Sequence, residues 1–253
     1  MTTTDPVPPV RDPRRAALDR ETAMLLAATE YRRYLDQLRV LDPGDWNRPT
    51  DCPLWDVREM ATHSLGMARL VTSADELMRQ VTTAAQRGPG VDHITALQVE
   101  EGAHLRPAQI VAAYAAGVEP AALGRRARAE TMDERPMPEH HQVNGVAEGW
   151  TFGFLFDVIL TRDTWMHRVD IARATGKELE LTADHDGVLV ADIVAEWAGR
   201  HGRPFALTLT GPAGGSFARG AAAPASELDA VEFCRIVSRR APGAGLLETE
   251  VPF

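Results

Sequence analysis

The chain has few cysteines, no long apolar run and no excess of basic residues. Its 253 residues include two cysteines, Cys52 and Cys234, which form no disulfide framework and fit a reducing, intracellular setting. No apolar stretch reaches the roughly 18 residues of a membrane span, and no signal-peptide pattern is present, so we expect a cytoplasmic protein without a membrane partner. The net charge of −9 and the lack of a basic stripe argue against a nucleic-acid partner.

The remaining composition is that of an ordinary globular protein, with 44% hydrophobic and 25% charged residues. Residues 1–13 contain four prolines and few large apolar side chains, which predicts a mobile tail. Apolar residues then recur with the period of a helix, and this pattern changes near residue 177. We therefore expect an α+β chain in two parts, a bundle of four long helices over 14–176 and a small α/β domain over 177–253.

Apolar stripes with the period of a helix predict long helices at 14–41, 57–85 and 148–175, and a further helix is predicted at 107–132, with Pro107 in its first turn. Asp56 and Glu59 are typical of a capping box at the start of the second helix. Pro120 predicts a kink or a break in the third helix. The segment around Pro136 and His141 is expected to be a loop.

After Gly176 the pattern becomes mixed. It predicts a helix at 186–199, a strand at 205–210, a turn at 211–215 and a partner strand at 216–219. Ser226 is expected to cap a final helix, and 246–253 to be extended. The glycines at 211–215 match neither a P-loop nor a dinucleotide-binding pattern.

Three polar residues interrupt the apolar stripes of the second and fourth predicted helices. Asp163 and His167 are four residues apart, so they lie on one helix face, and His63 comes from another helix. Two imidazoles and a carboxylate with one open position are typical of catalytic zinc. Helix bundles build metal sites from such inward-facing residues, and the spacing therefore predicts a divalent metal site. In the alternative, Asp163 forms an ion pair with Arg69 or Arg126, and both histidines are ordinary core residues.

Other candidate residues have weaker patterns. Asp170 is placed to orient a ligand histidine, or else to pair with Arg168 or Arg173. Cys52 lies in a proline-bounded loop as a potential but unpartnered thiol, and no nucleophile elbow occurs, so we assign no catalytic protein nucleophile.

Two segments of the chain resemble the mycothiol-dependent maleylpyruvate isomerase family, within the wider DinB/YfiT-like group. The first is DWNRPTDCPLWDVREMATHSLG over residues 45–66, and the second is RDTWMHRVDIARATG over residues 162–176. The C-terminal part, with GPAGG at 211–215 and EFCR at 232–235, is similar to the small sterol-carrier-like domain of many actinobacterial members. The resemblance covers almost the whole chain after the tail.

The resemblance implies a four-helix bundle with a divalent metal, most simply zinc, near one end. Its ligands would be His63, Asp163 and His167, the residues already selected by spacing. Relatives often carry His or Glu at the middle position, and the shorter Asp163 predicts weaker affinity or another preferred metal.

The implied activity is that of a thiol-dependent transferase or isomerase, with mycothiol or a similar small thiol as cosubstrate and a small electrophile as substrate. Arg235 or Arg239 would hold a substrate carboxylate. Three alternatives stay open: a hydrolase that uses metal-activated water, a non-haem iron enzyme, and a non-catalytic small-molecule-binding module. The sequence is compatible with a monomer or a homodimer.

Overall fold

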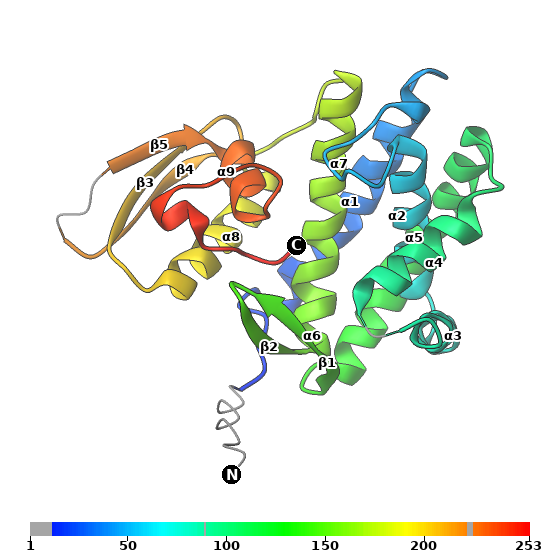
Figure 1. Ribbon diagram of the computed structural model, residues 1–253, viewed down its shortest axis with the longest axis horizontal. Coiled ribbons are helices and arrows are strands. Elements are labelled where there is room, and N and C mark those ends of the chain that lie inside the picture. Colours follow the sequence, from blue (N-terminus) through cyan, green and yellow to red (C-terminus); the bar gives the residue numbers. More distant parts are fainter. Residues whose placement is uncertain (1–11, 89, 222–224) are drawn as a thin grey trace, which may run out of the picture.

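The N-terminal part of the chain folds into a bundle of four long helices. The computed structural model describes residues 12–88, 90–221 and 225–253, so the predicted tail at 1–13 lies almost wholly outside the described residues. The bundle helices are α1 (Arg20–Arg39), α2 (Val57–Leu70), α5 (Pro107–Met132) and α7 (Leu160–Thr175). Because α1 and α2 each contact both α5 and α7, the four helices enclose one core (Figure 1). The predicted α+β fold class with a helical N-terminal part is confirmed.

Capping residues set where the first two bundle helices begin. Asp56 accepts a hydrogen bond from the Glu59 backbone and Glu59 returns one, which confirms the predicted capping box of α2. The predicted start of the first helix at residue 14 is wrong. Asp19 caps α1 through the Thr22 backbone N–H, and Arg14 instead bonds through its backbone to the strand that ends at Thr151.

The predicted helix over 57–85 is broken in two. α2 ends at Leu70, and α3 (Ala74–Ala85) begins after Ser73, whose hydroxyl accepts from the Glu76 backbone. The break lies where α5 crosses, since a Cβ added at Gly124 would stand 2.3 Å from the Val71 carbonyl oxygen. α4 (Val91–Gly102) follows and packs on α2 and α3, although the sequence pattern predicted no element there. By contrast, α5 runs unbroken through Pro120, so of the predicted kink or break the break is wrong.

A β-hairpin replaces the loop predicted around Pro136 and His141. β1 (Pro136–Val143) pairs antiparallel with β2 (Val146–Thr151). Asn144 and Gly145 form the turn with φ of 53° and 73°, the left-handed pair that the tightest hairpins require. The fourth predicted helix therefore starts later than residue 148, after the strand. α6 (Phe152–Phe154) and a π-helical turn, η2 (Leu155–Ile159), lead directly into α7.

The chain after Gly176 forms a small three-stranded sheet with two helices. Its elements are α8 (Asp186–His201), β3 (Phe205–Thr210), β4 (Gly215–Arg219), β5 (Ala225–Asp229), α9 (Ala230–Val237) and the 3-10 turn η3 (Gly245–Glu248). The sheet order is β4-β3-β5, with β3 antiparallel to β4 and parallel to β5. The predicted helix near 186–199 and both predicted strands are confirmed. Ser226 lies in β5 and Asp229 caps α9, and η3 occupies part of the predicted extended end.

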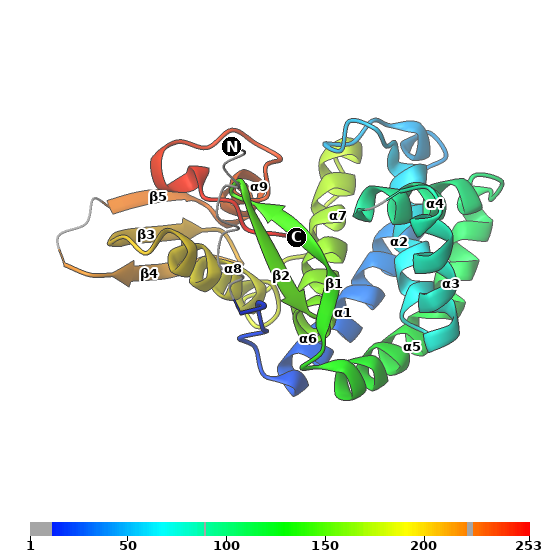
Figure 2. The same cartoon turned by 60° about the horizontal axis from the view of Figure 1, so that its bottom comes forward.

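α7 lies between the two parts of the chain. Ile171 packs into the bundle core, whereas Trp165 and Val169 belong to the core shared with α8 and α9. The hairpin and the last residues of the chain lie between the bundle and the small sheet in both views (Figures 1 and 2). The position of α7 is therefore stabilised by two hydrophobic cores, the bundle core and the core around α8 and α9.

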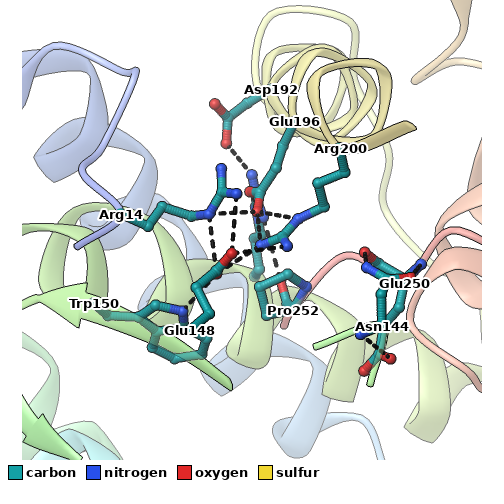
Figure 3. Close-up of polar contacts among 10 residues, drawn as sticks. Arg14, Asn144, Glu148, Trp150, Asp192, Glu196, Arg200, Glu250 and Pro252 are labelled. Atoms are coloured by element: carbon teal, nitrogen blue, oxygen red, sulfur yellow. Dashed lines mark hydrogen bonds and ion pairs between the residues drawn. The ribbon is translucent and has the colours of Figure 1, made fainter. Parts of the chain in front are cut away.

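Polar contacts hold this junction together. Glu148 on the hairpin accepts from Arg14 at 3.0 Å and from Arg200 of α8 at 2.9 Å (Figure 3). Arg162 of α7 pairs with Glu196 at 2.6 Å and donates to the Pro252 carbonyl at 3.2 Å. These bonds fix the segment that ends at Phe253. Within the described ranges, no helix has the length and apolar character needed to cross a membrane.

Candidate metal centre

The structure brings together the three residues selected by spacing. His63 lies on α2, and Asp163 and His167 lie one turn apart on α7. Asp163 contacts Nε2 of His167 at 3.2 Å and Nε2 of His63 at 3.6 Å, and one ligand atom from each residue falls within 4.8 Å of the others. Asp163 therefore faces the two histidines, not Arg69 or Arg126.

Each histidine is oriented by a partner on its other ring nitrogen. Nδ1 of His63 lies 2.8 Å from Oε1 of Gln98, whose amide group donates to Gln80. Nδ1 of His167 lies 3.3 Å from Oδ2 of Asp170. Because both partners are acceptors, Nδ1 carries the hydrogen in each ring and Nε2 is left to face Asp163.

Burial and charge act against each other at these groups. Burial favours the neutral form of His167, but Asp163 and Asp170 outweigh it and raise the pKa of His167 to about 9. Burial also favours neutral Asp163, yet His167 and His63 hold the pKa of that carboxyl well below its ordinary value. In the metal-free protein, the centre is therefore a buried carboxylate paired with an imidazolium.

The donor set fits a divalent ion. Nε2 of His167 is buried, and Asp163 lies 3.2 Å from it without hydrogen-bonding geometry. Two imidazole nitrogens with one carboxylate oxygen are ordinary zinc ligands. The carboxylate is also the one member that keeps solvent access, since 21% of the Asp163 side chain is exposed against 3% for each histidine.

That exposure opens into an apolar cavity of about 210 Å³. The cavity is enclosed by α2, α3, α4, the hairpin, the segment from Phe152 to Leu160, and Phe253. Its apolar walls include Met67, Leu70, Leu77, Val81, Ile94, Met137, Trp150, Leu155, Ile159 and Leu160. The polar groups at the cavity are His63, Asp163, Thr95, Glu139 and His141. The candidate metal centre therefore lies at one end of a pocket suited to a small apolar molecule.

The opposite side of the centre is polar and is completed by the C-terminal part. Asp170 accepts from Nε of Arg240 at 3.0 Å, and Sγ of Cys52 lies 3.8 Å from Asp170. Cys52 comes from the loop after η1 (Asp45–Asn47). Burial, reinforced by the charge of Asp170, raises the pKa of Cys52 to about 11, so its thiol stays protonated at neutral pH. Asp170 therefore pairs with Arg240, not with Arg168 or Arg173.

The arginines predicted to hold a substrate are engaged elsewhere. Arg235 is buried against Asp51 at 3.0 Å and Glu232 at 2.6 Å, and Arg239 points to Glu250 at 3.5 Å. Neither is among the residues that line the cavity. Arg240 and Gln98 are the site residues that the sequence analysis missed. No motif marks either residue, since each reaches the centre through tertiary packing alone.

A further buried cluster combines Glu30, His185 and Asp186. Glu30 accepts from Arg168 at 2.6 Å, and Asp186 accepts from Arg33 and from the Trp165 indole. Because arginines already neutralise both carboxylates, this cluster is an ionic link between α1, α7 and α8. His185 and Asp186 begin α8, as predicted.

Comparisons with known proteins agree with this architecture. Residues 27–172 match the family model described as the mycothiol maleylpyruvate isomerase N-terminal domain. A crystal structure of the mycothiol-dependent maleylpyruvate isomerase has a TM-score of 0.50 and 16% identity to this chain, over 88% of this chain and 90% of that one. A histidine-to-alanine variant of the mycothiol-dependent maleylpyruvate isomerase matches over the same shares with a TM-score of 0.50 and 15% identity.

No curated protein matches the chain. The family model covers more than half of the sequence and includes α2, α5 and most of α7. Of these helices, α2 carries His63, and α7 carries Asp163, His167 and Asp170. The predicted enzyme type, that of the maleylpyruvate isomerases, is thereby confirmed at the level of the family. The chain belongs to the family defined by the mycothiol maleylpyruvate isomerase N-terminal domain.

Proposed function

We propose that the protein is a metal-dependent isomerase or transferase that uses a small thiol of the mycothiol type to attack an electrophilic substrate. His63, Asp163 and His167 would hold a divalent ion, most simply zinc. The observation that carries the proposal is the convergence of two Nε2 atoms and one carboxylate beside an apolar cavity. Family membership supports the thiol.

The residues around the centre would serve binding and orientation. Gln98 and Asp170 hold the two imidazole rings with Nε2 facing inward. A divalent ion held there would lower the pKa of a small thiol so that the thiolate is present at neutral pH. The apolar walls would exclude water and hold the carbon skeleton of the electrophile beside the thiol. Cys52 is not the nucleophile in this scheme, because its own pKa is about 11.

The domain organisation is also part of the proposal. We assign 14–176 to the metal-binding bundle of the DinB-like type and 177–253 to a small domain similar to sterol carrier proteins. The second hydrophobic core, which α8, α9 and β3 form against Trp165 and Val169 of α7, supports this division. In this arrangement the small domain would close the polar side of the centre through Arg240, and its affinity for an apolar ligand remains a prediction.

The experiment compares metal content and thiol-dependent turnover in the wild type and in a His63→Ala variant. We expect about one divalent ion per wild-type chain, together with turnover that requires added thiol. The variant should lose both. His141→Ala is the matched control, since His141 lines the cavity but is no candidate ligand, and it should keep its metal. Retention of metal and activity in His63→Ala would exclude the proposal, and turnover without any thiol would favour a hydrolase.

A further inference from the structure

The residues that line the cavity indicate which class of substrate the candidate metal centre would act on. We propose that the electrophile bound here has an uncharged and largely apolar body, so that a dicarboxylate such as maleate is a poor substrate. This inference rests on the proposed function for the reaction, but the selectivity of the cavity for its ligand can be measured without metal or thiol.

The described residues that line the cavity include no lysine and no arginine. Two acids, Glu139 and Asp163, are present instead. Burial lowers the pKa of His141, so this imidazole is neutral at pH 7. Away from the candidate metal position, a carboxylate placed against these walls would lose its hydration without gaining a cationic partner, which is strongly unfavourable.

The guanidinium beside Phe253 is already neutralised. Arg162 lies 6.0 Å from the ring of Phe253, but it pairs with Asp192 at 2.5 Å and Glu196 at 2.6 Å. Phe253 lines the cavity, whereas Arg162 does not. The C-terminal segment therefore gives the cavity an apolar wall and keeps the charge of Arg162 away from a ligand.

The volume limits the size of the ligand. A dry apolar cavity of about 150 Å³ accepts benzene. The present cavity of about 210 Å³ therefore holds a single ring with a short substituent. Because the cavity is partly open to solvent, a short alkene diester can bind with one ester arm extending out of it. Trp150 and Phe152 supply aromatic surface for such a ligand.

The first test measures binding to metal-stripped protein by titration calorimetry, with ethylbenzene and benzoate as probes of similar size. We expect ethylbenzene to bind at least tenfold more tightly than benzoate. Equal or tighter binding of benzoate would overturn the inference. Removal of the metal ensures that a carboxylate cannot bind simply as a metal ligand.

Variants locate this selectivity in the cavity. Leu77 is 8% exposed and lines the wall, so Leu77→Arg should weaken ethylbenzene binding at least tenfold and strengthen benzoate binding. Leu123→Arg introduces the same charge at a residue that is 63% exposed and outside the cavity, and it should change neither affinity. If Leu77→Arg does not fold, Leu77→Phe tests whether ethylbenzene binds in this cavity. The larger side chain fills the cavity, so it should lower the affinity for ethylbenzene tenfold. Unchanged binding in Leu77→Phe would overturn the inference.

The second test compares turnover of diethyl maleate and maleate by metal-loaded protein with a small thiol. The thiolate adds to one alkene carbon, the central bond rotates, and the thiolate leaves, so the thiol is recovered. We expect kcat/KM to be at least tenfold higher for the diester after subtraction of the spontaneous rate, and the reverse order would overturn the inference. If ethylbenzene binds selectively but neither alkene reacts, the ligand class is supported and the proposed thiol chemistry is overturned.

Discussion

Asp170 joins two residues that are far apart in the sequence. Its carboxylate accepts from Nε of Arg240 at 3.0 Å, seventy residues further along the chain, and contacts Nδ1 of His167 at 3.3 Å. Burial alone would raise the pKa of Asp170, but His167 and Arg240 together lower it, so the group stays ionised. The C-terminal part of the chain thereby influences the orientation of a candidate metal ligand.

Asp170→Asn should weaken metal binding. The amide cannot accept from His167 and Arg240 as an ionised carboxylate does, and the loss of such an outer partner typically lowers metal affinity about 10–100-fold. Competition with a chromophoric chelator measures this affinity. Arg239→Met is the control, because Arg239 contacts Glu250 and not Asp170. An unchanged affinity in Asp170→Asn would show that the His167–Asp170 contact does not support metal binding.

Glu148 should make the protein acid-sensitive. Burial opposes its charge, but Arg14, Arg200 and Trp150 hold its pKa at about 2, against an ordinary value of 4.5. Since the pKa is depressed in the folded state, Glu148 contributes its full stabilisation above pH 4.5. That contribution, roughly 3 kcal/mol in the free energy of unfolding, is lost as the pH falls from 4.5 towards 2.

Urea unfolding of Glu148→Gln across this range checks the prediction. The variant should be less stable than the wild type by about 2–3 kcal/mol at pH 7, and the difference should shrink at pH 2. Glu119→Gln, at an exposed position of α5, serves as the control and should show no such trend. A stability difference in Glu148→Gln that does not depend on pH would contradict the prediction.

Cys52 should react slowly with alkylating reagents at neutral pH. With its pKa at about 11, its thiolate fraction at pH 8 is about 100-fold lower than that of a free cysteine. Labelling of the native protein by iodoacetamide should therefore accelerate as the pH rises towards 11. Cys52→Ser identifies the labelled residue, because the remaining Cys234 is fully buried. Rapid labelling of Cys52 at pH 7 would show that its thiolate is stabilised after all.

Gly124 should tolerate no larger residue. Its hydrogen faces the Val71 carbonyl at the break between α2 and α3, and an alanine Cβ would stand 2.3 Å from that oxygen. Gly124→Ala should lower the free energy of unfolding by about 1–3 kcal/mol. Gly117→Ala in the same helix meets nothing within 4 Å, so it should raise stability by about 0.5–1 kcal/mol. Thermal unfolding of the two variants distinguishes the effect of close packing at Gly124 from that of helix propensity. An equal change in stability in both variants would exclude the steric explanation.

Several elements were predictable because their signals are local. The capping box at Asp56, the proline that begins α5 at Pro107 and the alternation in Phe205–Thr210 each lie within a few neighbouring residues. The two helix segments with the candidate ligands were also found locally, since four-residue spacing puts Asp163 and His167 on one face. The family resemblance rested on those same segments.

The wrong assignments have physical causes in competing local signals. Prolines and histidines at 136–141 suggested a loop, whereas Asn144-Gly145 is the stronger signal and closes a hairpin. The break after Leu70 has no breaker residue in the sequence. It arises where Gly124 of α5 approaches the Val71 backbone, a contact between distant segments.

The sequence by itself determined the helical bundle, the mixed C-terminal part and the three candidate ligands, because helix period, capping and ligand spacing are encoded over short distances. Only the tertiary structure decided which partners orient those ligands, since Gln98 and Arg240 come from α4 and from the segment after α9. The cavity likewise exists only after folding, because its walls come from α2, α3, α4, the hairpin, the segment from Phe152 to Asp163, and Phe253. The absence of lysine and arginine among its described lining residues, which sets the expected substrate class, is a property of that assembled surface.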